Sequence, residues 1–310
     1  MVQQIIESSK QSWASAKRNL AARLLERSEE VMKTLFLDGD LTDYLCLLSR
    51  LPNYYFRNLL LIYDQYPEAS CLAGFSAWQK LLERRSPGQM VLKAENIKKN
   101  DIKVIAPFTN VIEPGKSELV WFSLSLYDVK QTNIANVKLY NSAYTQDSSH
   151  FNYLLASLRE VLGTDYRRSV VFISDDETFN LSGLEGYVTE HTVQVHKGLS
   201  DDKLFHWLLE VICNLAVEDI AFPAPVQSLL TESICFCLLN IWGLPYVGLL
   251  SGNHSLVPAA AQEAFLDALQ RIVFDLSQRI EAIYLSLKEE ELYLSGDFDK
   301  LLIDDPEALF

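Results

Sequence analysis

The sequence lacks several features that define whole classes of protein. Its cysteines are few, odd in number and without a Cys-x-x-Cys pair, so neither a disulfide framework nor a cysteine zinc site is predicted. The first 20 residues are polar and amphipathic, without the apolar stretch of a secretory signal, and we find no apolar run that reaches membrane-spanning length. We therefore expect a cytoplasmic protein that makes no contact with a membrane and keeps free thiols at Cys46, Cys71, Cys213, Cys235 and Cys237.

Motifs of catalysis are also missing. The chain has no His-Glu-x-x-His, the pattern in which two histidines one helical turn apart bind zinc and the glutamate activates a bound water. No serine lies in a Gly-x-Ser-x-Gly turn, and there is no glycine-rich phosphate loop. The sequence therefore predicts no cofactor and argues against an enzyme.

Positive charge is scarce in the second half of the chain. Residues 1–145 carry 18 Lys and Arg against 15 Asp and Glu, a net charge of +3, whereas residues 146–310 carry 9 against 26, a net charge of −17. A protein binds nucleic acid largely by neutralising phosphates with cations. A chain of 310 residues that is 49% apolar also has room for two cores. We therefore predict domains at residues 1–145 and 146–310, of which only the first suits a nucleic acid.

Hydrophobic periodicity predicts an α+β fold, with helices plus a small antiparallel sheet in the first domain and a helical second domain with a small sheet. Apolar residues at helical spacing predict helices at residues 3–35, 41–51, 54–65, 148–162, 202–218 and 258–291. Period-two alternation predicts hairpins at 102–127 and 184–197 and a further strand at 169–174. The polar residues 142–150 are expected to link the domains.

The segment 202–218, DKLFHWLLEVICNLAVE, is the most distinctive predicted helix. It is apolar nearly all round, which is typical of a helix at the centre of a domain. His206, Glu210 and Asn214 interrupt it at four-residue spacing, so they share one face. Because a buried carboxylate is costly unless it is paired or bound to metal, this polar line predicts either a paired buried group or a metal site.

The run at residues 53–82, NYYFRNLLLIYDQYPEASCLAGFSAWQKLL, resembles the N-terminal domain of the ArdC-type and LtrC-like antirestriction family of plasmids, phages and conjugative elements. The similarity continues through Lys103 and Ile105-Ala106-Pro107 to YDVKQT at residues 127–132. It implies a single-stranded-DNA-binding domain followed by a zincin-like, metallopeptidase-like domain. The matching positions are Tyr54, Asn58, Leu61, Ile62, Gln65, Pro67, Ala69, Gly74, Phe75 and Trp78.

Single-stranded DNA is bound by aromatic rings that stack on bases and by cations that contact phosphates. In the resembling region we expect Phe75 and Trp78 to lie in the core, because aromatic residues at helical spacing usually do. Arg57 and the tyrosines beside it are better candidates for DNA contact. The predicted DNA-binding residues are Tyr54, Tyr55, Arg57, Asn58, Lys80, Arg84, Lys98 and Lys99.

In the resembled family, the helix after the second hairpin carries the zinc motif. Aligning it with Trp207 and the two leucines that follow places Glu210 at the first histidine, Val211 at the catalytic glutamate and Asn214 at the second histidine. The family's third ligand lies in a Glu-Ser-x-x-Tyr/Phe pattern, which Glu232 matches. The resemblance therefore implies an inactive domain in which Glu210, Asn214 and Glu232 occupy relic positions and bind no metal.

These observations favour a non-catalytic single-stranded-DNA-binding protein of a mobile element, related to antirestriction or conjugation. Two alternatives stay open. The chain could be a scaffold that binds a protein partner through its acidic second half. It could also be a peptidase with an atypical metal site formed by His206, Glu210 and Glu232, with Asn214 assisting.

Overall fold

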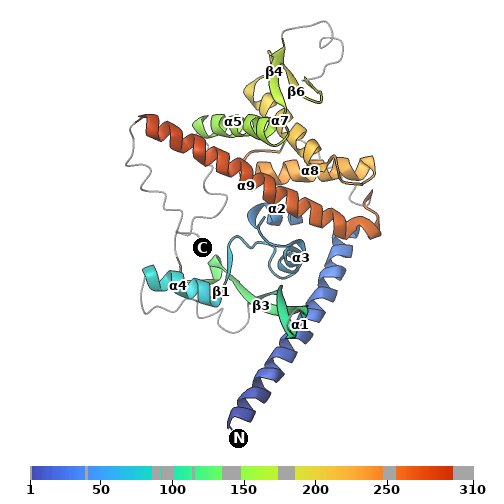
Figure 1. Ribbon diagram of the computed structural model, residues 1–310, viewed down its shortest axis with the longest axis vertical. Helices are drawn as coiled ribbons and strands as arrows, with labels where there is room; N and C mark the ends of the chain where they lie inside the picture. Colours follow the sequence, from blue (N-terminus) through green and yellow to red (C-terminus); the bar gives the residue numbers. More distant parts are fainter. Residues whose placement is uncertain are drawn as a thin grey trace. The chain divides into compact units, whose positions relative to one another are not determined.

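The computed structural model describes residues 2–38, 41–85, 92, 101–113, 116–134, 148–173, 186–246 and 256–295. Helices and two three-stranded sheets make up a mixed α+β fold (Figure 1), which confirms the predicted fold class. The chain divides into two compact units. Unit 1 consists of residues 1–143, 240–242 and 249–270, and unit 2 of residues 144–239, 243–248 and 271–310. Unit 1 thus includes segments from the second half of the chain, and the boundary at residue 145 stays a prediction.

The first 85 residues of unit 1 are mostly helical. The three helices predicted here are confirmed, and α2 ends two residues before Pro52, as expected because proline disfavours the α region in the residue before it. Their apolar faces form the core of the unit, where Leu45, Leu48 and Leu59 are completely buried. The helices are α1 (Val2–Asp38), α2 (Leu41–Arg50), α3 (Phe56–Gln65) and α4 (Phe75–Arg85).

The sheet of unit 1 has the order β1-β3-β2 and is antiparallel throughout. Its strands are β1 (Leu72–Gly74), β2 (Ile102–Glu113) and β3 (Lys116–Asp128). The predicted hairpin corresponds to β2 and β3. We did not predict β1, because three residues are too few to show an alternating pattern. One face of the hairpin packs Ile105 and Trp121 against Ala21 of α1 and Leu61 of α3.

The sheet of unit 2 has the order β4-β6-β5. Its strands are β4 (Ser169–Ile173), β5 (Gly186–Val188) and β6 (Thr192–His196), with β4 parallel and β5 antiparallel to β6. The helix α5 (Ser148–Thr164) precedes the sheet, and α7 (Asp201–Val217) follows it. The predicted strand and hairpin are therefore confirmed. Most of the predicted linker, residues 142–147, lies outside the described residues.

The helix α7 has the buried apolar surface that its sequence predicts. Leu204, Leu208 and Ile212 are at most 3% exposed. The helix α8 (Ala224–Ile241) follows α7, and a 3-10 turn (Ala259–Ala261) leads into α9 (Gln262–Ser295). The start of α9 belongs to unit 1 and its remainder to unit 2.

By length and composition α8 could cross a membrane, which corrects our statement that no apolar run is long enough. Its mean hydropathy is 1.3 over Ala224–Ile241, and 61% of that stretch is buried within the fold. Leu230, Ile234 and Leu238 are completely buried. Core helices of globular proteins also meet such a criterion, so we interpret α8 as a core helix.

Truncating the centre of α7 should destabilise the protein strongly. Leu208 is completely buried, so Leu208→Ala should lower the free energy of unfolding by about 2–5 kcal/mol, through lost apolar burial and the cavity left behind. Urea unfolding of the full chain measures this change. Glu210→Gln, two residues away on an exposed face, is the matched control and should shift stability by less than about 0.5 kcal/mol. Equal effects of the two variants would contradict a core position for α7.

Candidate functional site

Asn58 and Gln65 of α3 bind the outer edge of β2 through paired hydrogen bonds. The amide of Asn58 donates to the carbonyl of Ile105 at 2.9 Å and accepts from its N–H at 2.9 Å. The amide of Gln65 makes the same pair with Lys103, at 2.9 Å in each direction. Residues seven apart lie on one helix face, so α3 presents both amides to alternate residues of one strand. This use of Asn58 differs from the predicted DNA contact.

Asp128 organises the opposite edge of the sheet, where β1 pairs with β3. Its buried carboxylate accepts hydrogen bonds from the backbone N–H groups of Ser70, Cys71 and Lys130, at 2.7–3.1 Å. Gln131 completes a capping box by accepting from the N–H of Asp128 at 2.7 Å. The YDVKQT pattern of the resemblance is thus explained by packing, since it joins β1, β3 and the turn after β3.

Two further predicted DNA-binding residues are held within unit 1. The Tyr54 hydroxyl donates to the Leu72 carbonyl at 2.8 Å, and burial raises the pKa of Tyr54 to about 12. The Arg57 guanidinium, only 13% exposed, forms ion pairs with Glu263 at 2.7 Å and Glu29 at 3.8 Å. Contact between Arg57 and a phosphate would therefore require these pairs to separate.

The other predicted DNA-binding residues have varied positions. Tyr55, Lys80 and Arg84 are exposed, while Lys98 and Lys99 lie outside the described residues. The expectation of a core position is confirmed for Trp78, which is 3% exposed and donates to the Tyr127 carbonyl at 2.8 Å. It is wrong for Phe75, the first residue of α4, which is 49% exposed although it lies on the same helix face as the buried Trp78 and Leu82.

A second aromatic and basic surface, which we did not predict, lies on the hairpin face that does not pack against Ala21. The rings of Phe108 and Phe122 meet edge to face with centroids 5.7 Å apart. The Arg18 guanidinium of α1 lies over the Phe122 ring at 5.6 Å. Phe108 is 57% and Leu124 is 42% exposed. The period-two alternation of residues 119–127 indicates a strand with two different faces, but the sequence does not indicate which face the helices would cover.

The expected buried polar line on α7 is wrong. Glu210 and Asn214 are exposed and His206 is half-buried. The helix is covered on the remaining faces, so its polar residues simply mark the side that faces solvent. Asn214 accepts a hydrogen bond from the Thr231 hydroxyl of α8 at 3.1 Å. The desolvation cost that suggested a metal site therefore does not arise.

The relic positions nevertheless lie close to one another. Glu232 is half-buried on α8 and accepts from the Ser228 hydroxyl at 3.3 Å. Burial and, after it, the negative charges of Glu232 and Glu210 raise the pKa of Tyr246 to about 12. Next to them, burial raises the pKa of Cys213, which shares a hydrogen bond with Cys235. The Cys213 thiol is therefore protonated at neutral pH and is not a ready metal ligand.

The donor set at the relic positions does not fit a catalytic zinc ion. It offers two carboxylates and a neutral amide, whereas zinc sites use imidazole, thiolate and carboxylate donors, three from the protein when catalytic. Val211, at the catalytic glutamate position, cannot accept a proton from water. Within the described ranges, no three His, Cys, Asp or Glu side chains are grouped so that they could hold a metal ion.

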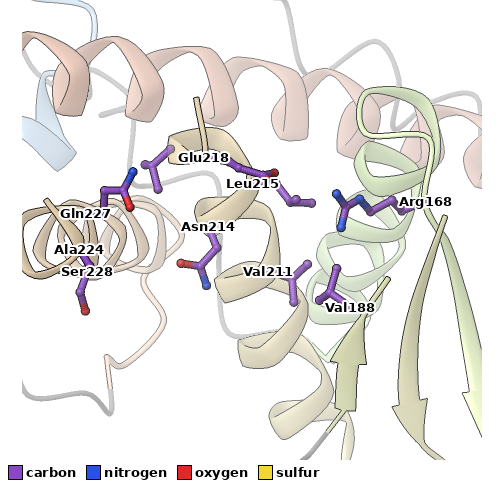
Figure 2. A pocket seen from close by; sticks show the side chains of 10 residues that line it. Arg168, Val188, Val211, Asn214, Leu215, Glu218, Ala224, Gln227 and Ser228 are labelled. Atoms are coloured by element: carbon purple, nitrogen blue, oxygen red, sulfur yellow. The ribbon is translucent and has the colours of Figure 1, made fainter. Parts of the chain in front are cut away.

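A cavity of about 560 Å³ opens beside the relic positions, within unit 2. Its walls come from β5, α7 and the start of α8, and Arg168, which precedes β4, closes one side (Figure 2). Its lining is mixed. Val188 and Val211 are apolar, Asn214 and Gln227 are neutral and polar, and Glu218 is acidic. None of the described residues that line this cavity is aromatic, so these residues provide no surface for base stacking.

The fold and the site define a two-unit α+β protein in which Glu210, Asn214 and Glu232, the positions that the resemblance aligns with zinc ligands, do not form a zinc-binding set. Two solved structures of the antirestriction protein ArdC from plasmid R388 are similar to this chain. The metal-free structure has a TM-score of 0.42 and 12% sequence identity, covering 84% of this chain and 96% of that chain. The Mn(II)-bound structure has a TM-score of 0.43 and 12% identity, covering 84% and 97%. No family model and no curated protein matches the sequence.

Removing the Asn58 amide should loosen the edge of β2. Asn58→Ala leaves the N–H and carbonyl of Ile105 without their partner, so we expect a loss of about 1–3 kcal/mol in the free energy of unfolding. Urea unfolding measures it. Asn53→Ala, at an exposed position before α3, is the control and should change stability by less than about 0.5 kcal/mol. An unchanged stability of Asn58→Ala would show that the pairing with β2 contributes little.

Purified protein should contain no stoichiometric zinc and should cleave no peptide, because the donor set lacks nitrogen and thiolate ligands and Val211 replaces the general base. Elemental analysis of the full chain and a casein-cleavage assay measure the two properties. One zinc per chain that is lost in Glu232→Ala would contradict this prediction and support the atypical peptidase.

Proposed function

We propose that this chain is a non-catalytic single-stranded-DNA-binding protein of a mobile element, with an antirestriction or conjugation-related role. Its second unit is a peptidase-like fold without catalysis. The observation that carries DNA binding is the contact of Arg18 with Phe122, beside the exposed Phe108. Support also comes from the sequence resemblance over residues 53–132 and from the net charge of +3 on residues 1–145.

The hairpin face suits stacking better than the turn at residues 54–58. Tyr54, Arg57 and Asn58 already bind the protein itself, and Glu263 and Asp267 lie near Tyr55, where their negative charge opposes phosphate. Phe108 instead exposes more than half of its surface. An exposed ring accepts any base, and a nearby arginine contacts phosphate, so binding on this face would depend little on sequence.

The second unit contributes no chemistry in this proposal. Its acidic charge repels DNA, which confines the nucleic acid to unit 1 and lowers the affinity of the whole chain. A scaffold that binds a protein through the acidic half is the second candidate, and the cavity beside Glu218 favours it.

Phe108→Ala should weaken the binding of a fluorescein-labelled dT20 oligonucleotide to the full chain by about tenfold, because each base–aromatic stack contributes about 1–3 kcal/mol. Arg18→Ala should weaken binding and lower the salt dependence, whose log–log slope we expect at roughly −2 to −3 for three or four phosphate contacts. Fluorescence anisotropy across a salt series measures both effects.

Phe75→Ala is the matched control, since Phe75 is an exposed phenylalanine of the same unit on α4. It should leave DNA affinity unchanged. Equal losses in the Phe75 and Phe108 variants would remove the hairpin face from the proposal. If the wild-type chain does not bind the oligonucleotide at low salt, the DNA-binding function itself is wrong.

A further inference from the structure

The cavity in unit 2 arises where β5 and α7 separate. At one end the two elements touch closely, because a Cβ on Gly186 would lie 2.7 Å from ring carbons of Trp207 and 2.3 Å from the carbonyl oxygen of Gln194. Glycine is therefore required there. Two residues later, Val188 faces the cavity together with Val211, one helical turn beyond Trp207 (Figure 2). The cavity thus lies directly along the strand.

The strand that forms this wall has an open side. Among the described strands, β5 pairs only with β6 and lies at the edge of its sheet. Thr189 donates its N–H to the Thr192 carbonyl at 2.8 Å. Because hydrogen-bonded and non-hydrogen-bonded pairs alternate along an antiparallel ladder, the N–H and carbonyl of Val188 point away from β6. An edge of this kind accepts another extended strand.

Side chains of an added strand would alternate between the cavity and solvent. Val188 pairs with the completely buried Val193, so its side chain lies on the helix-facing side of the sheet. Residues of an added strand on that side would enter the cavity. A volume of about 560 Å³ is in the range of small-ligand sites. It is large enough for aliphatic side chains against Val188 and Val211.

The charges around the cavity favour one type of added strand. Glu218 lines the cavity and the exposed Asp219 follows it, while residues 146–310 carry a net charge of −17. Arg168, the only cation among the described residues of the cavity, already donates to the carbonyl of Thr189 at 2.9 Å. An incoming segment with lysine or arginine beside Glu218 is therefore favoured over an acidic one.

We propose that the cavity between β5 and α7 binds an extended basic peptide segment of a partner protein, which adds a strand to β5 and is not cleaved. Main-chain hydrogen bonds to Val188 supply affinity, and aliphatic side chains fill the cavity. Glu218 selects for positive charge. This binding is independent of the DNA surface on unit 1.

A fluorescein-labelled hexapeptide of alternating valine and lysine tests the proposal on the full chain by fluorescence anisotropy. We expect binding with a Kd below about 1 mM, and affinity at least about tenfold weaker when alternate backbone nitrogens are methylated or when glutamate replaces lysine. In hydrogen exchange, the peptide should slow the Val188 amide. Absence of binding at about 1 mM peptide would overturn the proposal.

Two variants locate the binding. Ala224→Trp places a large side chain in the cavity from an exposed position at the start of α8, and Glu218→Lys reverses the selecting charge. Each should weaken the valine–lysine peptide about tenfold with an unchanged thermal unfolding midpoint. Glu160→Lys, an exposed position of α5, makes the same change in net charge and should have little effect. Equal losses in Glu160→Lys and Glu218→Lys, or full binding by Ala224→Trp, would overturn the assignment to the cavity.

Discussion

The position of the small sheet in unit 1 depends on the hydrogen bonds that the backbone groups along the outer edge of β2 make. An edge strand leaves alternate N–H and carbonyl groups without a partner, which costs stability when they are buried and invites other strands when they are exposed. Here the side-chain amides of Asn58 and Gln65 supply those partners at Ile105 and Lys103. The spacing of seven residues on α3 fixes the strand to the helix. This fixed position orients the hairpin, with one face against α1 and α3 and with Phe108 and Leu124 exposed on the other.

The outer edge of the sheet in unit 2 differs from that of the sheet in unit 1. The described part of the chain places no strand or side-chain amide along the outer edge of β5, and a cavity lies beside it. Gly186 allows the strand to touch Trp207 at one end, and the separation beyond it creates the open space. The outer edge of β2 in unit 1 is thus occupied by side-chain amides, whereas the outer edge of β5 in unit 2 lies beside a cavity.

The positions on α7 that the resemblance aligns with a zinc motif lie outside the buried core of unit 2. The apolar residues of α7 and α8 still form a core, including the buried Leu208, Ile212 and Ile234. The solvent-facing positions are free to change because they contribute little to that core. Glu210 and Asn214 lie on this side, so packing requires no particular residue at either position.

The sequence by itself determined α1, α2, α3, α5, α7 and α9, both hairpins and the absence of a zinc motif, because hydrophobic periodicity and motif spacing are local properties. Tertiary structure alone decided which polar residues are exposed. Glu210 and Asn214 were predicted to be buried and lie in solvent, since an apolar helix can still leave one narrow face uncovered. Asn58 suggested a DNA contact, but its role depends on Ile105, a strand residue 47 positions away. Such pairings depend on the fold, and the residue pattern within a single segment of the sequence does not predict them.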